Sequence, residues 1–120
     1  MQAAEGKIQQ SLIIPEIGKD ETMASSIHYK DYILEQLSGL VSISCRPMMG
    51  EYLLYYQGTL FGGIYDDRLL VKKTAGNEKY SLAESIPYDG AKAMYLVSDV
   101  DDRKKLEKIV LDTYTRLLKR

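Results

Sequence analysis

Apolar residues recur every three or four positions near both ends of the chain, which is the spacing of a helix with one buried side. The first pattern begins at Ser26, which can cap a helix, and Gly39 lies where that helix would end. The second begins after Ser98, with acidic residues at its start and basic residues at its end, as the helix dipole favours. The expected apolar stripes are Tyr29, Ile33, Leu37 and Leu40 in the first helix, and Leu106, Ile109, Val110, Thr113 and Leu117 in the second.

The residues between the two helices alternate between apolar and polar, which is typical of strands. Residues 57–58 and 66–67 have the composition of two-residue hairpin turns, and Pro47 ends or bends the first strand. Residues 74–84 are ambiguous and could form a short helix. The predicted strands are residues 41–45, 51–56, 59–65, 68–73 and 93–97. The order α-β-β-β-β-(α)-β-α indicates an α+β fold of two layers, with both helices on one face of an antiparallel sheet.

Two-residue turns also predict which strand residues face the same way, because directly opposed residues share a face. Tyr56 then pairs with Thr59, and Tyr65 pairs with Arg68. One face is almost entirely aliphatic and is the expected core beneath the helices. It carries Leu53, Tyr55, Leu60, Gly62, Ile64, Leu69 and Val71. A bulge at Gly62–Gly63 would shift this register.

The opposite face of the predicted sheet combines aromatic rings with cations, a composition that recognition surfaces favour. We therefore predict a partner interface there, and its alternative is the ordinary solvated face of an antiparallel sheet. A further alternative is that residues 12–17 or 74–84 fold over this face and cover it. The predicted interface consists of Tyr52, Tyr56, Phe61, Tyr65, Arg68 and Lys72.

A chain of 120 residues with 45% hydrophobic residues has room for one domain with one core. Residues 1–22 differ in composition from the rest, with Pro15 and Gly18 interrupting any regular pattern. They are expected to be an extension that is either flexible or docked as a short strand through Leu12, Ile13, Ile14 and Ile17. Residues 23–120 are expected to form the domain.

Charge and residue content exclude several classes of function. Sixteen basic residues against seventeen acidic ones give a net charge of −1, which argues against direct DNA binding by this chain alone. One cysteine and one histidine cannot build a zinc site, and no cofactor-binding motif is present. The apolar runs are too short for a membrane helix or a secretory signal, so we expect a cytoplasmic protein.

No pairing of nucleophile and base can be read from the sequence, so we expect that the protein is not an enzyme. Asp66–Asp67 is an adjacent acidic pair, but aspartate is common in turns on structural grounds alone. The alternative is a small-molecule-binding or enzymatic site that uses Asp66, Asp67 and Arg68.

Residues 46–52, with the sequence Arg-Pro-Met-Met-Gly-Glu-Tyr, and the hairpins that follow resemble the N-terminal domain family of TfoX/Sxy competence regulators. Met49 stands where the family usually has phenylalanine, and Glu51 where it usually has glycine. The positions that carry the resemblance include Arg46, Met48, Met49, Gly50, Tyr52, Gly58, Asp66, Leu70 and Lys72.

The resemblance spans about residues 27–117 and implies a two-layer α/β domain with no catalytic residues. It also implies a regulatory role in natural competence, exerted with the cyclic-AMP receptor protein at promoters. Because full-length regulators carry a second, C-terminal helical domain, this chain is expected to be a stand-alone N-terminal domain. We therefore expect a non-catalytic regulatory or protein-interaction domain. Its partner would be a protein, either part of the transcription machinery or a second copy of the chain.

Overall fold

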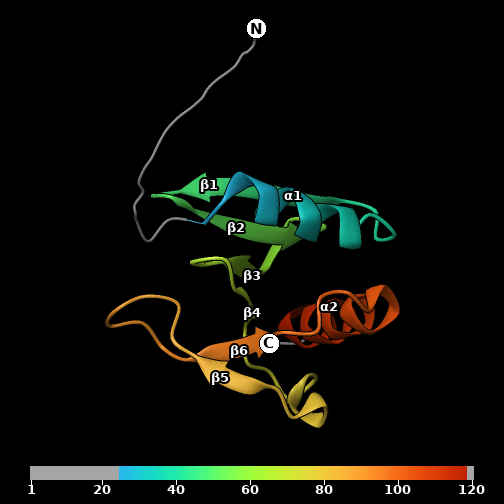
Figure 1. Cartoon of the computed structure of the whole chain (residues 1–120). Coiled ribbons are helices and arrows are strands. Elements are labelled where there is room, and N and C mark those ends of the chain that lie inside the picture. The colour runs from blue at the N-terminus through green and yellow to red at the C-terminus, as the bar shows by residue number, and fades with distance from the viewer. Residues whose placement is uncertain (1–24, 119–120) are drawn as a thin grey trace, which may run out of the picture.

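The computed structural model of the chain describes residues 25–118, and Figure 1 shows how its helices and strands are arranged. The expectations for residues 1–22 lie outside the described residues. In chain order the elements are α1 (Ile27–Gln36), β1 (Ile43–Met48), β2 (Glu51–Tyr56), β3 (Thr59–Ile64), β4 (Leu69–Val71), the 3-10 turn η1 (Glu78–Tyr80), β5 (Ala83–Ser85), β6 (Met94–Val97) and α2 (Arg103–Leu118).

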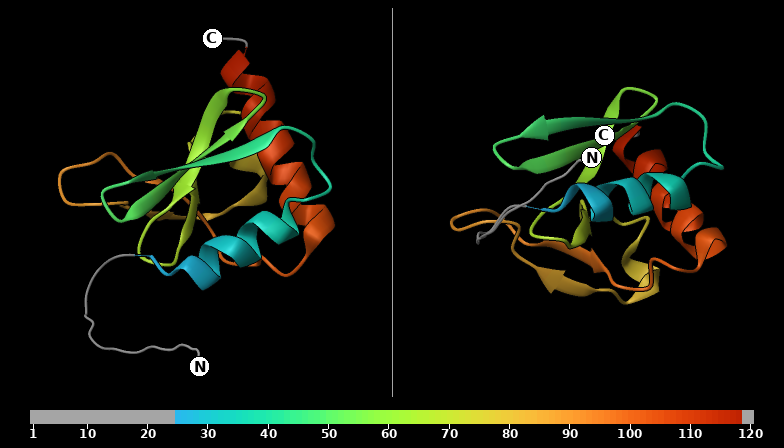
Figure 2. Two further views of the ribbon diagram at one scale, coloured as in Figure 1. Left: turned by 90° about the horizontal axis from the view of Figure 1, so that it is seen from above. Right: turned by 45° about the horizontal axis from the view of Figure 1, so that its top comes forward.

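The six strands form one antiparallel sheet in the order β1-β2-β3-β4-β6-β5. The sheet twists strongly, and α1 and α2 lie on its concave side (Figure 2). The α+β class and the predicted order of elements are therefore confirmed. The ambiguous stretch before residue 85 forms both η1 and the additional edge strand β5.

Side-chain caps begin both helices. The Ser26 side chain accepts a hydrogen bond from the Tyr29 amide at 3.0 Å, as predicted for the start of α1. α2 begins later than predicted, because Asp102 and not Ser98 caps it. The Asp102 carboxylate accepts from the Lys105 amide at 3.1 Å.

Three consecutive hairpins connect the first four strands, each with a two-residue turn. Both residues of each turn have positive φ, which is the type I′ geometry that matches the twist of the flanking strands. The φ values are 54° and 87° at Met49–Gly50, 49° and 83° at Gln57–Gly58, and 53° and 55° at Asp66–Asp67. The two turns predicted from the sequence are confirmed.

A β-bulge in β3 changes the predicted register. Tyr56 pairs with Thr59 and Tyr55 with Leu60, but Leu54 pairs with Gly62 rather than with Phe61. Phe61 is therefore the extra residue, and the pairing beyond it is displaced by one position. A displacement of one residue exchanges the two faces of a strand, so part of the face assignment is reversed.

The core lies between the concave side of the sheet and the two helices. Ile64, Leu69 and Val71 are fully buried there, as predicted, together with the central residues of the helical stripes, whereas Tyr29, Leu40 and Leu117 are partly buried. Leu53, Tyr55 and Leu60 were predicted to be core, and this is wrong: all three are only partly buried and lie on the opposite face. The fully buried apolar side chains of this core are Ile33, Leu37, Leu54, Phe61, Ile64, Leu69, Val71, Val97, Leu106, Ile109 and Val110.

The edge strand β1 begins later and ends later than predicted. Val41 is 72% exposed and precedes the strand, whereas Pro47 lies within it. The Gln57 amide donates to the Ser42 carbonyl across the hairpin. Along an antiparallel strand, residues that bond to the neighbouring strand alternate with residues that do not. The backbone nitrogen of Pro47 therefore points toward the open edge of the sheet. Proline has no N–H to donate, so it fits this position and interrupts the edge.

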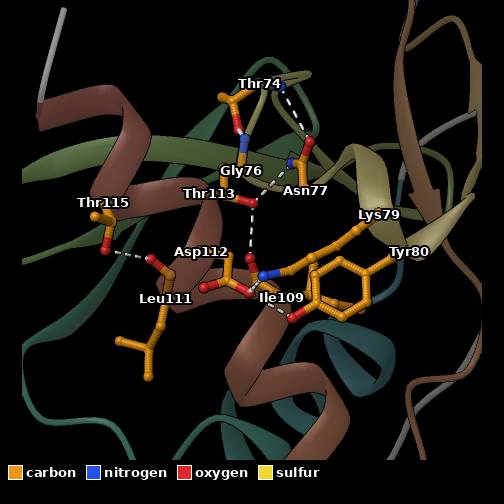
Figure 3. Close-up of polar contacts among 10 residues, drawn as sticks. All are labelled: Thr74, Gly76, Asn77, Lys79, Tyr80, Ile109, Leu111, Asp112, Thr113 and Thr115. Carbon is orange, nitrogen blue, oxygen red and sulfur yellow. Dashed lines mark hydrogen bonds and ion pairs between the residues drawn. The ribbon is translucent and has the colours of Figure 1, made fainter.

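A buried polar cluster attaches residues 74–80 to α2 (Figure 3). The Asn77 amide nitrogen donates to the Lys72 carbonyl and to Thr113 Oγ1, both at 2.8 Å, and Asn77 Oδ1 accepts from the Thr74 amide at 3.0 Å. The Tyr80 hydroxyl donates to the Asp112 carboxylate, which lowers the pKa of Asp112, and burial and this bond raise the pKa of Tyr80 to about 12. These contacts hold the chain between β4 and β5 against the helix.

Candidate functional site

The six residues predicted to form one interface do not share one surface. Phe61 is fully buried, and Tyr56 is 8% exposed with its ring edge-on to Tyr114 of α2 at a centroid distance of 4.7 Å. Tyr52 is half-buried on the same face, under the ammonium group of Lys30 at 5.6 Å. Because of the bulge at Phe61, the prediction of a shared exposed face is wrong for these three aromatic residues.

The other three predicted residues, Tyr65, Arg68 and Lys72, lie beside a loop that contains the sequence Pro-Tyr-Asp-Gly at residues 87–90, which is typical of a turn. This loop, residues 86–93, connects β5 to β6 and projects from the side of the molecule away from α2 (Figures 1 and 2). Two pockets flank it, and both are lined by Pro87 and Tyr88. We call them the basic pocket and the acidic pocket.

The basic pocket has a volume of about 550 Å³ and opens on the face of the sheet that the helices leave uncovered. Its walls combine apolar side chains with three lysines, and no carboxylate lines it. Such a volume lies in the range of ligand-binding sites. The lining residues are Leu60, Gly62, Tyr65, Lys72, Lys73, Pro87, Tyr88, Ala91, Lys92, Ala93 and Met94.

The three lysines of the basic pocket differ in their partners. Lys73 forms an ion pair with Glu84 at 2.8 Å and lies 5.5 Å from the centre of the Tyr95 ring. Among residues 25–118, neither Lys72 nor Lys92 forms an ion pair. These two ammonium groups are therefore available to an anionic partner.

Two tyrosines connect the sheet to the loop. The Tyr65 and Tyr88 ring centres are 6.2 Å apart, and the rings are tilted by 47°. Tyr65 is 6% exposed, and burial raises the pKa of its hydroxyl, whereas Tyr88 is 59% exposed. A Cβ at Gly63 would lie 2.8 Å from the Tyr65 ring, so only glycine at that position lets the ring lie against the strand.

The acidic pocket lies on the other side of the loop and has a volume of about 340 Å³. Three carboxylates and one guanidinium line it, from Glu51, Asp66, Asp89 and Arg68. This is where the sequence suggested an alternative small-molecule or catalytic site at residues 66–68. Of the residues of this turn, Asp67 and Arg68 make structural contacts through their side chains, and Asp66 makes one through its backbone amide.

The carboxylates near the 66–67 turn attach the start of α1 to the sheet. Glu51 Oε1 accepts from the Ser25 hydroxyl at 2.6 Å and from the Asp66 amide at 3.1 Å. Asp67 Oδ1 accepts from the Ser26 amide at 2.7 Å, and the Asp67 amide donates to Ser25 Oγ at 3.1 Å. The turn geometry and these bonds give structural reasons for an acidic pair at this position.

Arg68 holds the loop against the sheet. Its Nε donates to the Tyr65 carbonyl at 3.0 Å, and its terminal nitrogens donate to the Ile86 carbonyl at 3.1 Å, the Pro87 carbonyl at 3.3 Å and the Ser85 hydroxyl. A guanidinium suits this role because its donors are fixed in one plane. Arg68 is therefore a positioning residue for the wall that the two pockets share, and not an exposed contact.

Replacing Arg68 with alanine is expected to loosen the loop without unfolding the domain. Amide hydrogen exchange in residues 86–93 should become several-fold faster, because the bonds that hold the loop are lost. Arg103→Ala is the matched control, since Arg103 donates to Glu35 and Ser38 on the helical side. Equal protection of the loop in both variants would contradict the assignment.

The remaining residues of the predicted family motif lie away from the two pockets. Arg46, Met48, Met49 and Gly50 are exposed at the end of β1 and in the first turn, where Met49 is 97% exposed. Gly58 occupies the second turn at φ 83°, and Leu70 is buried in β4. Tyr88 and Lys92 line the basic pocket but were not among the predicted residues, because a turn sequence does not indicate which surface the turn reaches.

Within the described residues, no group of three or more histidine, cysteine or acidic side chains is placed to hold a metal ion. No helix between residues 25 and 118 is long and apolar enough to cross a membrane. The geometry described above can bind a partner through charge and aromatic contact.

The fold and the sequence together define a small α+β domain with the strand order and turns described above. Residues 35–116 match the family model of the TfoX N-terminal domain, and the chain belongs to this family. It is similar to an uncharacterized 12.7 kDa protein in the trpE 5′ region of Spirochaeta aurantia. The two are 34% identical over 80 residues, which cover 65% of this chain and 70% of that protein.

Proposed function

We propose that the chain is a non-catalytic regulatory domain that binds a protein partner through the loop 86–93 and the two pockets beside it. The observation that carries this proposal is the composition of this surface. It places an exposed tyrosine between three lysines on one side and three carboxylates on the other. Aromatic residues with charged surroundings are typical of protein interfaces.

Two further observations support a binding role, and a third concerns the cellular setting. The side chains of Glu51, Asp67 and Arg68 are occupied by hydrogen bonds that hold the fold together, which leaves these three residues little freedom for acid–base work. Membership of the TfoX N-terminal domain family accords with regulation in competence or transcription. The free thiol of Cys45 accords with a reducing, cytoplasmic setting.

Site-specific photo-crosslinking in the host cell tests this proposal. A photoreactive amino acid at position 88 is expected to capture a defined protein, either a second copy of the chain or another protein. The same amino acid at position 111 of α2 is the matched control, because Leu111 is 36% exposed on the helical side. Capture only from position 88 supports the proposal, and no protein adduct at position 88 would refute it.

A further inference from the structure

The surface around the loop 86–93 carries opposite charges on two adjoining pockets. The basic pocket is lined by three lysines and no acid, whereas the acidic pocket is lined by three acids and one arginine. The donors of that arginine, Arg68, are turned to carbonyl groups and a hydroxyl of the protein itself. Because the two pockets share Pro87 and Tyr88, positive and negative charge lie side by side.

The boundary between the two pockets is apolar and exposed. Tyr88 is 59% exposed and Ile86 is 52% exposed, and both belong to the loop that separates the pockets. A protein interface typically has an apolar centre with polar and charged groups around it. The loop therefore provides the apolar centre of an interface, and the two pockets provide the charged groups around it.

We propose that this surface binds a second copy of the chain about a two-fold axis near Tyr88. The basic pocket of each copy then faces the acidic pocket of the other. The inference rests on the proposed function and names the partner of the same surface. In a two-fold interface the same patch is used by both copies, so the patch must be complementary to itself. Adjoining regions of opposite charge with an apolar boundary meet this requirement.

Charge and shape both favour a second copy over a partner of one charge. A wholly basic surface would repel its own copy and would suit an acidic partner, but half of this surface is acidic. The net charge of −1 adds little repulsion between two whole chains. The loop also projects away from α2, so two copies can approach through it without a collision of their α2 helices (Figure 2).

Sedimentation equilibrium of the full chain and of three variants tests this inference. Lys72→Glu with Lys92→Glu reverses the basic pocket, and Asp66→Asn with Asp89→Lys reverses the acidic pocket. We expect the wild-type chain to dimerise and each reversed variant to associate at least about tenfold more weakly, because like charges then face each other. Lys104→Glu with Lys108→Glu is the matched control on exposed positions of α2 and should leave dimerisation unchanged.

Mixing the two reversed variants gives the decisive result. In a mixed pair each pocket again faces the opposite charge, so the mixture is expected to form a heterodimer although each variant alone does not. A monomeric wild-type chain, or a dimer that the reversals do not change, would overturn the inference. So would a mixture that stays monomeric. If position 88 crosslinks to a different protein while the wild-type chain is monomeric, the proposed function stands and only this inference fails.

Discussion

Replacing Phe61 with alanine is expected to lower the free energy of unfolding by about 3–5 kcal/mol, the usual cost of removing a buried phenylalanine ring. Phe61 is fully buried, and it is the extra residue of the bulge that turns it toward the helices. Its ring belongs to the same cluster as Leu54 of β2 and Ile109 of α2. Urea unfolding followed by circular dichroism measures the change.

The matched control for Phe61 is Tyr88→Ala, which also removes an aromatic ring. Tyr88 is 59% exposed, so its loss is expected to cost less than about 1 kcal/mol. The two variants test whether Phe61 lies on the buried face, as in the structure, or on the exposed face, as the register predicted from the sequence placed it. Unchanged stability of Phe61→Ala would mean that the bulge and the core are wrongly assigned.

Replacing Asn77 with alanine is expected to cost about 2–4 kcal/mol, although the side chain is polar. Asn77 is fully buried and makes three side-chain hydrogen bonds, to Lys72, Thr74 and Thr113. Alanine leaves buried donors and acceptors unpaired, and each unpaired group carries its full desolvation cost. Because these bonds join the chain after β4 to α2, hydrogen exchange in residues 74–80 should also accelerate (Figure 3).

A pair of threonines on α2 shows whether burial is the cause of the Asn77 effect. Thr113 and Thr115 each donate to a carbonyl four residues earlier, but Thr113 is fully buried and accepts from Asn77, whereas Thr115 is exposed. Thr113→Val should be destabilising and coupled to Asn77→Ala in a double-mutant cycle. Thr115→Val should be nearly neutral. Equal costs for the two valine variants would contradict this account.

Arg68 illustrates how structural and functional roles are related in this domain. It is next to the acidic turn that the sequence offered as possible chemistry, and it reaches across to residues 85–87. The loop between the basic and acidic pockets is therefore held in place by Arg68, whose side chain donates hydrogen bonds to other residues of the same chain. A partner would meet Tyr88 and the lysines, and Arg68 would keep them in place.

The two helices, five of the six strands and the order of these elements follow from the amino-acid sequence alone, whereas β5 was not predicted. Local signals carry this information: the apolar stripes of two helices, the cap at Ser26, and the two-residue turns at 57–58 and 66–67. Each signal acts within a few residues, so the elements can be predicted without knowledge of distant contacts. The family is likewise indicated by the sequence, because the motif at residues 46–72 lies in one continuous stretch of the chain.

The buried face of β2 and the position of the proposed binding surface, in contrast, are defined only by the tertiary structure. A single extra residue, Phe61, exchanges the faces, and whether a Gly62–Gly63 pair marks a bulge depends on packing against neighbouring strands. A Cβ at Gly62 would lie 2.2 Å from the Leu70 carbonyl oxygen, a contact that only the folded sheet creates. The two pockets bring together residues 51, 66–72 and 86–94, whose proximity arises from strand order and from the contacts of Arg68. No local pattern encodes such long-range contacts, because they are energetically defined only when the whole sheet and both helices are packed.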